Sequence, residues 1–387
     1  MKKHLYLLMT MIMVVSMSEL QVAGMMPSIA TDLDTSVSRV GLLVSMYSLG
    51  MALGGPVVAY MLRHIRPKLA LLSVVGLYAV LEALVPLIHE YWWVAILRIL
   101  TGCLSGATFG LSVTFGAQLA ESPTKIGEAI SIVLGGIMVG TVIGLPLSHY
   151  VAGALSWQTS FYLLAFIALC LFVASLFALP SRDPASQEAT EQDLRNLRSL
   201  RLWSRYLVSL LTIGAAYGSF TYFTPLLERN SGLTPNTTTV VLLTYGLFSF
   251  IGNLVVGKFA DSHAVTVLRI GHAVLIISLS IIAMFATTGW LTVTMVLLVG
   301  LAGVSMNPAL VTRVAEVGGT GNLVSTVHTS VITMGVTLGT AVSALSMSSA
   351  GNDPAIAMWT GAAFAGLAAI VFATQTYPFK RSTAPFI

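Results

Sequence analysis

The sequence has 387 residues, of which 56% are hydrophobic and only 9% are charged, and its mean hydropathy is +0.87. This composition excludes an ordinary soluble domain, in which about a quarter of the residues are charged. The net charge of +4 does not indicate nucleic-acid binding, because no basic stripe with interleaved aromatic residues is present. We therefore expect a membrane protein with no nucleic-acid partner.

Hydrophobic stretches of roughly twenty residues follow one another along the chain, and each can cross the ~30 Å hydrocarbon layer as a helix. The twelve predicted spans are 5–26, 40–61, 69–88, 92–117, 128–150, 158–180, 206–227, 238–257, 267–286, 289–312, 322–346 and 355–377. The first stretch resembles a signal peptide in its two Lys residues and apolar run, but Glu19 stands where cleavage would need small residues. We interpret it as a retained first helix.

The cationic residues lie in alternate gaps between these stretches. Of the 19 Lys and Arg residues, all but Arg39, Arg98 and Arg229 fall on one side if the spans simply alternate. The positive-inside rule assigns that side to the cytoplasm. We therefore expect a multi-pass protein of the cell inner membrane with both termini in the cytoplasm.

A polar stretch at 181–205 separates two repeated halves. The halves match at a nearly constant offset, and the matched pairs are Pro27 with Pro225, Gly54 with Gly252, Gly136 with Gly335, and Gly140 with Gly339. We predict an all-α membrane protein of twelve transmembrane helices in two pseudo-symmetric six-helix bundles, 1–180 and 206–387, joined by a cytoplasmic linker. Transporters built from repeats bind substrate near the midplane and expose it alternately to each side.

Small residues recur at a spacing of four in two of the spans, which lets helix backbones approach closely. They are Gly136, Gly140 and Gly144, followed by Pro146, in the span 128–150, and Gly335 and Gly339 in the span 322–346. One interpretation is a face that slides or rocks against the partner half. The other is static tight packing.

Four short segments, spread over most of the chain, form a pattern of their own. They are Met26-Pro27-Ser28-Ile29-Ala30, Arg98-Ile-Leu-Thr-Gly102, Gly144-Leu-Pro146 and Gly257-Lys-Phe-Ala-Asp261. Together they resemble the major facilitator superfamily, and within it the bacterial drug:proton antiporter branch that includes arabinose-type sugar exporters and purine efflux pumps. The resemblance implies the major facilitator fold, proton-coupled efflux with a link to drug resistance, and gating positions at Gly257 and Asp261.

The chain departs from that family at two positions. Arg63, which the repeat aligns with Asp261, stands where the family's loop carries an Asp that latches the cytoplasmic side. Gln158 stands where the branch usually has an Arg. The latch of the first half is therefore in question, whereas neither departure argues against transport.

Three ionisable residues lie inside predicted spans, where a charge costs about 2.5 to 3.5 kcal/mol on insertion scales. Glu82 and Arg98 are equally far from the turn near Glu90, and Glu19 lies eight residues before Pro27, so all three reach one layer. Either Glu82 and Arg98 neutralise each other and fix the hairpin, or Arg98 is a switchable partner of Glu19, which carries the coupled proton. The resemblance favours Glu19 and Arg98, because their helices line the central cavity of that fold.

Aromatic and polar side chains within the spans are candidates for a substrate cavity: Tyr47, Tyr217, Tyr222, Asn307 and His328. An imidazole such as that of His328 can exchange a proton near neutral pH. A single His in a membrane helix more often forms a helix-to-helix hydrogen bond, and each of the other side chains can equally serve packing.

We predict a proton-coupled secondary transporter, an antiporter that exports a drug, sugar or nucleoside by alternating access. The GxxxxGK[ST] nucleotide motif is absent from the sequence, so the energy would come from an ion gradient. We expect a monomer in the bilayer whose partners are substrate and protons, with no cofactor, metal or enzymatic activity. The alternatives are an importer or facilitator of the same fold, a membrane-embedded enzyme with converging catalytic groups, or a non-transporting sensor or scaffold.

Overall fold

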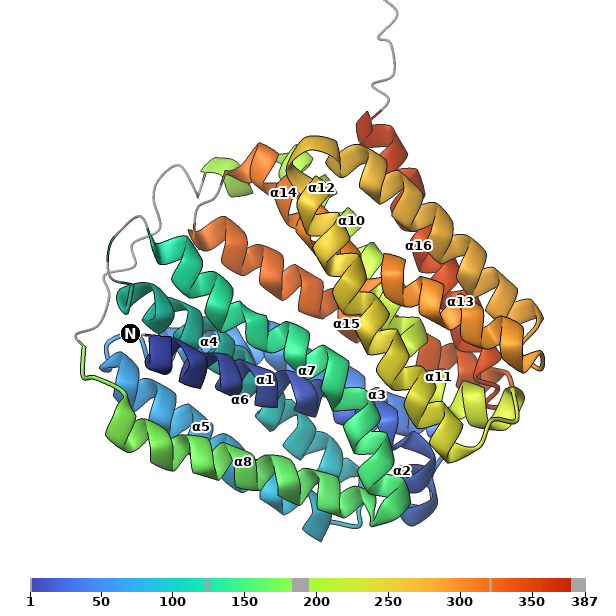
Figure 1. Cartoon of the computed structure of the whole chain (residues 1–387), viewed down its shortest axis with the longest axis horizontal. Helices are drawn as coiled ribbons and strands as arrows, with labels where there is room; N and C mark the ends of the chain where they lie inside the picture. Colours follow the sequence, from blue (N-terminus) through green and yellow to red (C-terminus); the bar gives the residue numbers. More distant parts are fainter. Residues whose placement is uncertain (1, 121, 123–124, 183–194, 320–321, 377–387) are drawn as a thin grey trace, which may run out of the picture.

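The computed structural model describes residues 2–120, 122, 125–182, 195–319 and 322–376. Within these ranges all regular elements are helices (Figure 1). Eleven helices are long and apolar enough to cross a membrane, or twelve if the bent pair Leu200–Phe220 and Phe223–Asn230 forms one span. The prediction of an all-α membrane protein is therefore confirmed.

The helices before the linker form the first half of the molecule. They are α1 (Lys2–Gly24), α2 (Met26–Asp32), α3 (Val37–Leu49), the π-helical η1 (Gly50–Gly54), α4 (Gly55–Met61), α5 (Pro67–Leu84), the 3-10 turn η2 (Val85–Leu87), α6 (Tyr91–Gln118), α7 (Ile126–Ala154) and α8 (Trp157–Ala178). Their starts follow local signals, because Ser36 and Ser156 cap α3 and α8, and Pro67 begins α5.

The second half comprises the helices after the linker. They are α10 (Leu200–Phe220), α11 (Phe223–Pro225), η4 (Leu226–Asn230), α12 (Pro235–Met284), α13 (Gly289–Ala302), η5 (Val304–Met306), α14 (Asn307–Gly318), α15 (Asn322–Ser349) and α16 (Ala355–Thr376). The long α12 contains two spans that meet at a kink at His263. The backbone of Asp261 is part of helix α12, whereas the side chain of Asp261 lies outside the described residues.

Helix α10 begins earlier than the sequence predicted, at Leu200 instead of residue 206. The reason is a small apolar cluster in which Leu202 and Tyr206 pack against Val314 and Val324. Burying these side chains stabilises an additional helical turn. The last part of the predicted linker 181–205 is therefore helical, and residues 183–194 lie outside the described residues.

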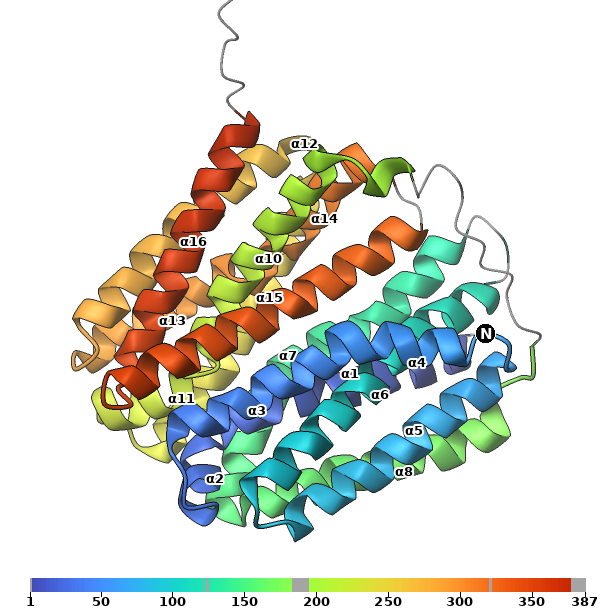
Figure 2. The same cartoon turned by 180° about the vertical axis from the view of Figure 1, so that it is seen from behind.

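The two halves use the same packing arrangement. In the first half α1 lies along α7, and in the second half α10, its counterpart in the repeat, lies along α15. The halves meet along two further helix pairs, α3 with α15 (Figure 2) and α7 with α12 (Figure 1). Pairing between equivalent helices agrees with the internal repeat seen in the sequence.

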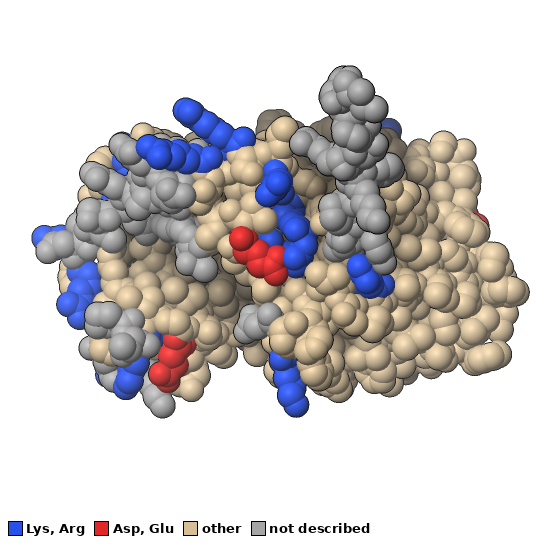
Figure 3. Space-filling model, turned by 90° about the horizontal axis from the view of Figure 1, so that it is seen from above, with Lys and Arg blue, Asp and Glu red and all other residues tan. Residues whose placement is uncertain are grey.

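The two ends of the bundle differ. The N-terminus, the turn between α4 and α5, and the start of α10 lie at one end, which we call the linker end. Exposed cations collect on its elements, including Arg63, Arg66, Arg198 and Arg201. Figure 3 shows a face on which Lys and Arg side chains are numerous and Asp and Glu are few. We call the opposite end, with α2, η4 and the turn between α15 and α16, the junction end.

The glycine faces pack within each half. A Cβ atom on Gly136 would lie 2.1 Å from the carbonyl oxygen of Met9 on α1, and one on Gly140 would lie 2.8 Å from that of Met13. Gly144 also faces α1, while Pro146 is buried inside α7. The interpretation of this face as a surface that slides against the partner half is therefore wrong. The glycines of α7 pack tightly against α1, the first helix of their own half.

The same contact recurs in the second half. A Cβ atom on Gly335 would lie 2.5 Å from the carbonyl oxygen of Leu210, and one on Gly339 would lie 2.1 Å from that of Gly214, both on α10. Gly257 differs, because a Cβ atom there would meet no atom of the described residues within 4 Å. Gly257 therefore makes no close helix-packing contact in this conformation.

We expect Gly339→Ala to lower the melting temperature of the purified protein by several degrees. The added methyl group would overlap the α10 backbone, and overpacking of this kind costs about 1 to 3 kcal/mol. Gly257→Ala is the matched control, because its methyl group would contact none of the described residues and Ala favours the helix by about 1 kcal/mol. Equal melting temperatures for the two variants would contradict the packing role of Gly339.

Candidate functional site

Arg98 on α6 is the centre of a buried polar network. Its side chain is fully buried, and its Nη1 and Nη2 atoms donate to the hydroxyl and the carbonyl oxygen of Ser18 on α1, at 3.1 and 2.8 Å. The guanidinium carbon lies 4.1 Å from the centroid of the Tyr47 ring on α3. An aromatic face attracts a cation more strongly when both are removed from water, so Arg98 is held on two sides.

Glu82 on α5 shares the same serine. Its Oε1 atom accepts a hydrogen bond from the Ser18 hydroxyl at 2.8 Å and another from the Gln21 amide. Among the described residues no ion pair directly joins Arg98 to Glu82 or to Glu19. The predicted neutralisation of Glu82 by Arg98 therefore runs through the Ser18 hydroxyl, which accepts from the cation and donates to the carboxylate.

The network reaches two more helices through Gln21 and Tyr47. The Gln21 side-chain oxygen accepts from Ser160 on α8 at 3.3 Å. The Tyr47 hydroxyl donates to the carbonyl oxygen of Val15 at 2.9 Å and lies 2.5 Å from the Ser105 hydroxyl. Polar contacts thus connect the helices α1, α3, α5, α6 and α8, as expected for polar groups removed from water.

Sequence reasoning missed Ser18 and Gln21. The signal was available, because both are polar residues in an apolar helix, and their spacing of three places them on one face. Glu19 follows Ser18 directly and therefore points about 100° away around the helix axis. This difference in direction separates the two carboxylates in the structure.

Glu19 stands apart from the network. Its side chain is 8% exposed, and within the described residues its carboxylate has no hydrogen-bond partner. It interacts electrostatically with Arg98 and Tyr47 of the first half and with Tyr217 of the second half. Glu19 is therefore close to Arg98 without being bonded to it, and it lies near the boundary between the halves.

The five cavity candidates do not converge on one site. Tyr47 uses its hydroxyl inside the network, and Tyr217 is half-buried with its ring edge-on to Phe220. Tyr222 is fully buried, and its hydroxyl occupies the space where a Cβ atom of Gly41 on α3 would stand. Of these three, Tyr47 and Tyr217 interact electrostatically with Glu19, and Tyr217 does so from the second half.

The other two candidates belong to the second half. His328 lies between α10 and α15, where its Nε2 atom is 2.8 Å from the Ser209 hydroxyl and its ring stacks on Tyr206. This is the helix-to-helix hydrogen bond that the sequence offered as the alternative. Asn307 begins α14, and its buried Oδ1 atom has no hydrogen-bond partner among the described atoms.

A short polar seam joins the halves beside this site. The hydroxyls of Ser45 and Thr340 are 2.7 Å apart, and those of Ser48 and Thr337 are 3.0 Å apart, between α3 and α15. Hydroxyl pairs of this kind contribute little net energy each and exchange easily for water or solute. The seam can therefore open without leaving a buried charge.

Comparisons with known proteins agree with this architecture. The model of the Major Facilitator Superfamily matches residues 7–327. The chain is 27% identical to the chloramphenicol resistance protein of Streptomyces lividans, over 89% of this chain and 88% of that protein. It is 26% identical to the inner membrane transport protein YdhP of Escherichia coli (strain K12), over 92% and 91% of the two chains.

Two further similarities concern a putative transporter and a solved structure. The chain is 27% identical to the putative transporter AraJ of Escherichia coli (strain K12), over 72% of this chain and 71% of that protein. Its fold matches the crystal structure of a bacterial homolog of the human lysosomal transporter Spinster, in an inward-facing and occupied conformation. That match has a TM-score of 0.77 with 15% identity and covers 96% of both chains.

Proposed function

This chain belongs to the Major Facilitator Superfamily of membrane transporters, and we propose that it exports a small organic solute in exchange for protons by alternating access. The observation that carries the proposal is Glu19, a carboxyl group close to the buried guanidinium of Arg98 but not bonded to it. A membrane carboxylate in this position is a reversible proton carrier. Members of this family are transporters, not enzymes. The proposal therefore concerns which solute is carried and in which direction it crosses the membrane.

Proton binding at Glu19 changes the forces on Arg98. When Glu19 is ionised, it attracts the guanidinium through a medium of low dielectric constant, in competition with the bonds to Ser18. When Glu19 is protonated, that attraction disappears and Arg98 keeps its bonds to α1. Because Glu19 also lies near Tyr217 of the second half, a change in its charge acts at the boundary that must open and close.

The orientation that we propose places the linker end in the cytoplasm of the cell inner membrane. The support is the enrichment of exposed Arg and Lys on that end, which the positive-inside rule predicts for the cytoplasmic side. The seam contacts between Ser45 and Thr340 and between Ser48 and Thr337 then lie in the path of a solute.

An uncharged drug is the substrate class that we propose first. The candidate site holds one cation and two carboxylates, and the cation and Glu82 already belong to one network. The relative from Streptomyces lividans is called a chloramphenicol resistance protein, and its similarity extends over 89% of this chain. Chloramphenicol is therefore the first compound to test, followed by arabinose and nucleosides.

We expect everted membrane vesicles that contain the protein to accumulate radiolabelled chloramphenicol when their lumen is acidified. In these vesicles the cytoplasmic side faces outward, so export appears as uptake driven by outward proton flow. A protonophore should abolish the accumulation, and vesicles without the protein give the background. Equilibration without accumulation would indicate a facilitator, and loss of preloaded drug on lumen acidification would indicate an importer. Failure with every compound of the panel would contradict the proposal.

A further inference from the structure

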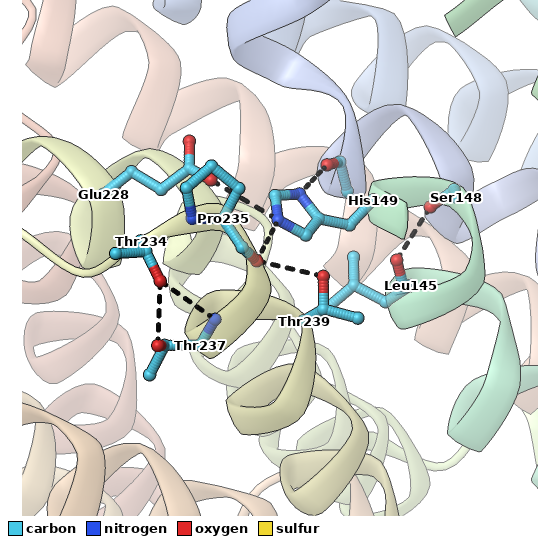
Figure 4. A network of polar contacts seen from close by, with 9 residues as sticks. Leu145, Ser148, His149, Glu228, Thr234, Pro235, Thr237 and Thr239 are labelled. Carbon is cyan, nitrogen blue, oxygen red and sulfur yellow. Dashed lines mark hydrogen bonds and ion pairs between the residues drawn. The ribbon is translucent and has the colours of Figure 1, made fainter. Parts of the chain in front are cut away.

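His149 near the end of α7 joins the two halves at the junction end (Figure 4). Its Nδ1 atom lies 3.0 Å from the carbonyl oxygen of Gly24 at the end of α1. Its Nε2 atom lies 3.1 Å from the carbonyl oxygen of Pro235 on α12 and 3.4 Å from Oε1 of Glu228 on η4. Both ring nitrogens therefore face oxygen atoms, one in the first half and two in the second.

A neutral imidazole cannot satisfy this arrangement. It carries a hydrogen on one ring nitrogen and a lone pair on the other, and a backbone carbonyl oxygen can only accept. If the extra proton were on Glu228 instead, Nε2 would still face the Pro235 oxygen without a hydrogen between them. The imidazolium form donates from both nitrogens and pairs with the Glu228 carboxylate, so it matches all three contacts.

We propose that His149 and Glu228 form a second proton-binding site, and that the protonated pair holds the two halves together at the junction end. Loss of the proton leaves Glu228 without a cation beside it and one ring nitrogen opposed to a carbonyl oxygen. The junction between α7 and α12 is then weakened. This inference rests on the proposed export function, in which the closed junction end is one state of the transport cycle. Proton binding at this site and closure of the junction end do not depend on which solute is carried.

The surrounding residues build the site. A Cβ atom on Gly24 would lie 2.3 Å from the Ser148 hydroxyl oxygen, so glycine is what lets the end of α1 reach the His149 ring. Thr234 caps α12 by accepting from the backbone nitrogen of Thr237 at 3.3 Å. This cap positions the first turn of α12, whose Pro235 carbonyl also accepts from the Thr239 hydroxyl at 3.0 Å.

The other charged groups on the elements that pack against His149 are bonded to other residues or lie farther away. On η4 the Arg229 guanidinium donates to the carbonyl oxygen of Asn352 at 3.0 Å. At the end of α2, Asp32 accepts from the side chains of Trp157 and Gln158. On α1 the nearest ionisable residue is Glu19, about one and a half turns before Gly24. The first turn of α12 carries no ionisable side chain.

A distance measurement across the junction end tests the proposal. Thr31→Cys on α2 and Ala350→Cys after α15 are exposed positions in opposite halves, and they carry spin labels in a background with Cys103→Ala and Cys170→Ala. Pulsed electron paramagnetic resonance then reports the closed and open populations without substrate or gradient. We expect the closed-to-open ratio of the wild type to fall about tenfold between about pH 5.5 and about pH 8, as the charged hydrogen bonds are lost.

The variants separate His149 from other titrating groups. His149→Gln should lower the ratio about tenfold at about pH 5.5, because glutamine holds no extra proton. Its pH dependence should be reduced to the part that Glu19 contributes. Glu228→Gln should lower the ratio at about pH 5.5, because the imidazolium loses the carboxylate that it pairs with in the second half. His89→Gln is the matched control: this exposed His lies in the turn between α5 and α6, and its replacement should leave the curve unchanged.

Two results would overturn the proposal. One is a wild type whose distances do not depend on pH, and the other is a His149→Gln variant with the pH dependence of the wild type. Each variant must first elute as a single symmetric peak in detergent. If His149→Gln does not, Glu228→Gln decides, and a closed-to-open ratio at about pH 5.5 equal to that of the wild type rejects the pair. None of these outcomes depends on transport, so a failed export assay leaves this test unaffected.

Discussion

Replacing Arg98 by Ala is expected to destabilise the first half by about 3 kcal/mol or more, because it leaves Glu82 buried without a nearby cation. The Ser18 carbonyl oxygen also loses its donor, and the face of Tyr47 loses the guanidinium that covers it. The measurement is the melting temperature and the monodisperse fraction of the protein in detergent. Arg39→Ala is the matched control, because Arg39 is an exposed residue at the junction end.

Combining Arg98→Ala with Glu82→Gln is expected to recover most of the stability. Glutamine keeps the side-chain oxygen that accepts from Ser18 and removes the buried charge. A double variant as unstable as the single one would show that Arg98 acts on the fold through its bonds to α1, not through Glu82. If the double variant is stable and also transports fully, Arg98 has no part in coupling.

Glu19→Gln is expected to abolish uphill transport and to leave folding unchanged. Glutamine is nearly isosteric with the protonated carboxyl group, and no hydrogen bond to Glu19 has to be replaced among the described residues. The variant therefore behaves as a permanently neutral site that carries no proton. In proteoliposomes with an imposed pH gradient, the wild type should concentrate the substrate, and the variant should only equilibrate it.

Glu82→Gln provides the matched control for that experiment. Glu82 is also a buried carboxylate on a membrane helix, but Ser18 and Gln21 hold it in the network with Arg98. We expect Glu82→Gln to retain accumulation at some loss of stability. Accumulation by Glu19→Gln, together with its loss in Glu82→Gln, would transfer the proton-carrying role to Glu82.

The sequence by itself determined the helices and their depths. Apolar length defined the membrane spans, because a helix must contain about twenty apolar residues to cross the hydrocarbon layer. The constant rise along a helix placed Glu19, Glu82 and Arg98 in one layer, and the structure links Glu82 and Arg98 through a residue of α1 at that depth. The internal repeat likewise paired Gly140 with Gly339, and in the structure each of them contacts the first helix of its own half.

Only the tertiary structure decided in which direction each side chain points. The rotation of a helix about its own axis is set by packing against its neighbours. In a membrane span almost all residues are apolar, so the sequence pattern does not show which face of the helix is buried. For this reason Ser18, not Glu19, bonds to Arg98, and the glycines of α7 face α1 instead of the partner half. The contact of His149 with Glu228 joins residues far apart in sequence, and it forms because α7 and α12 are adjacent in the folded bundle.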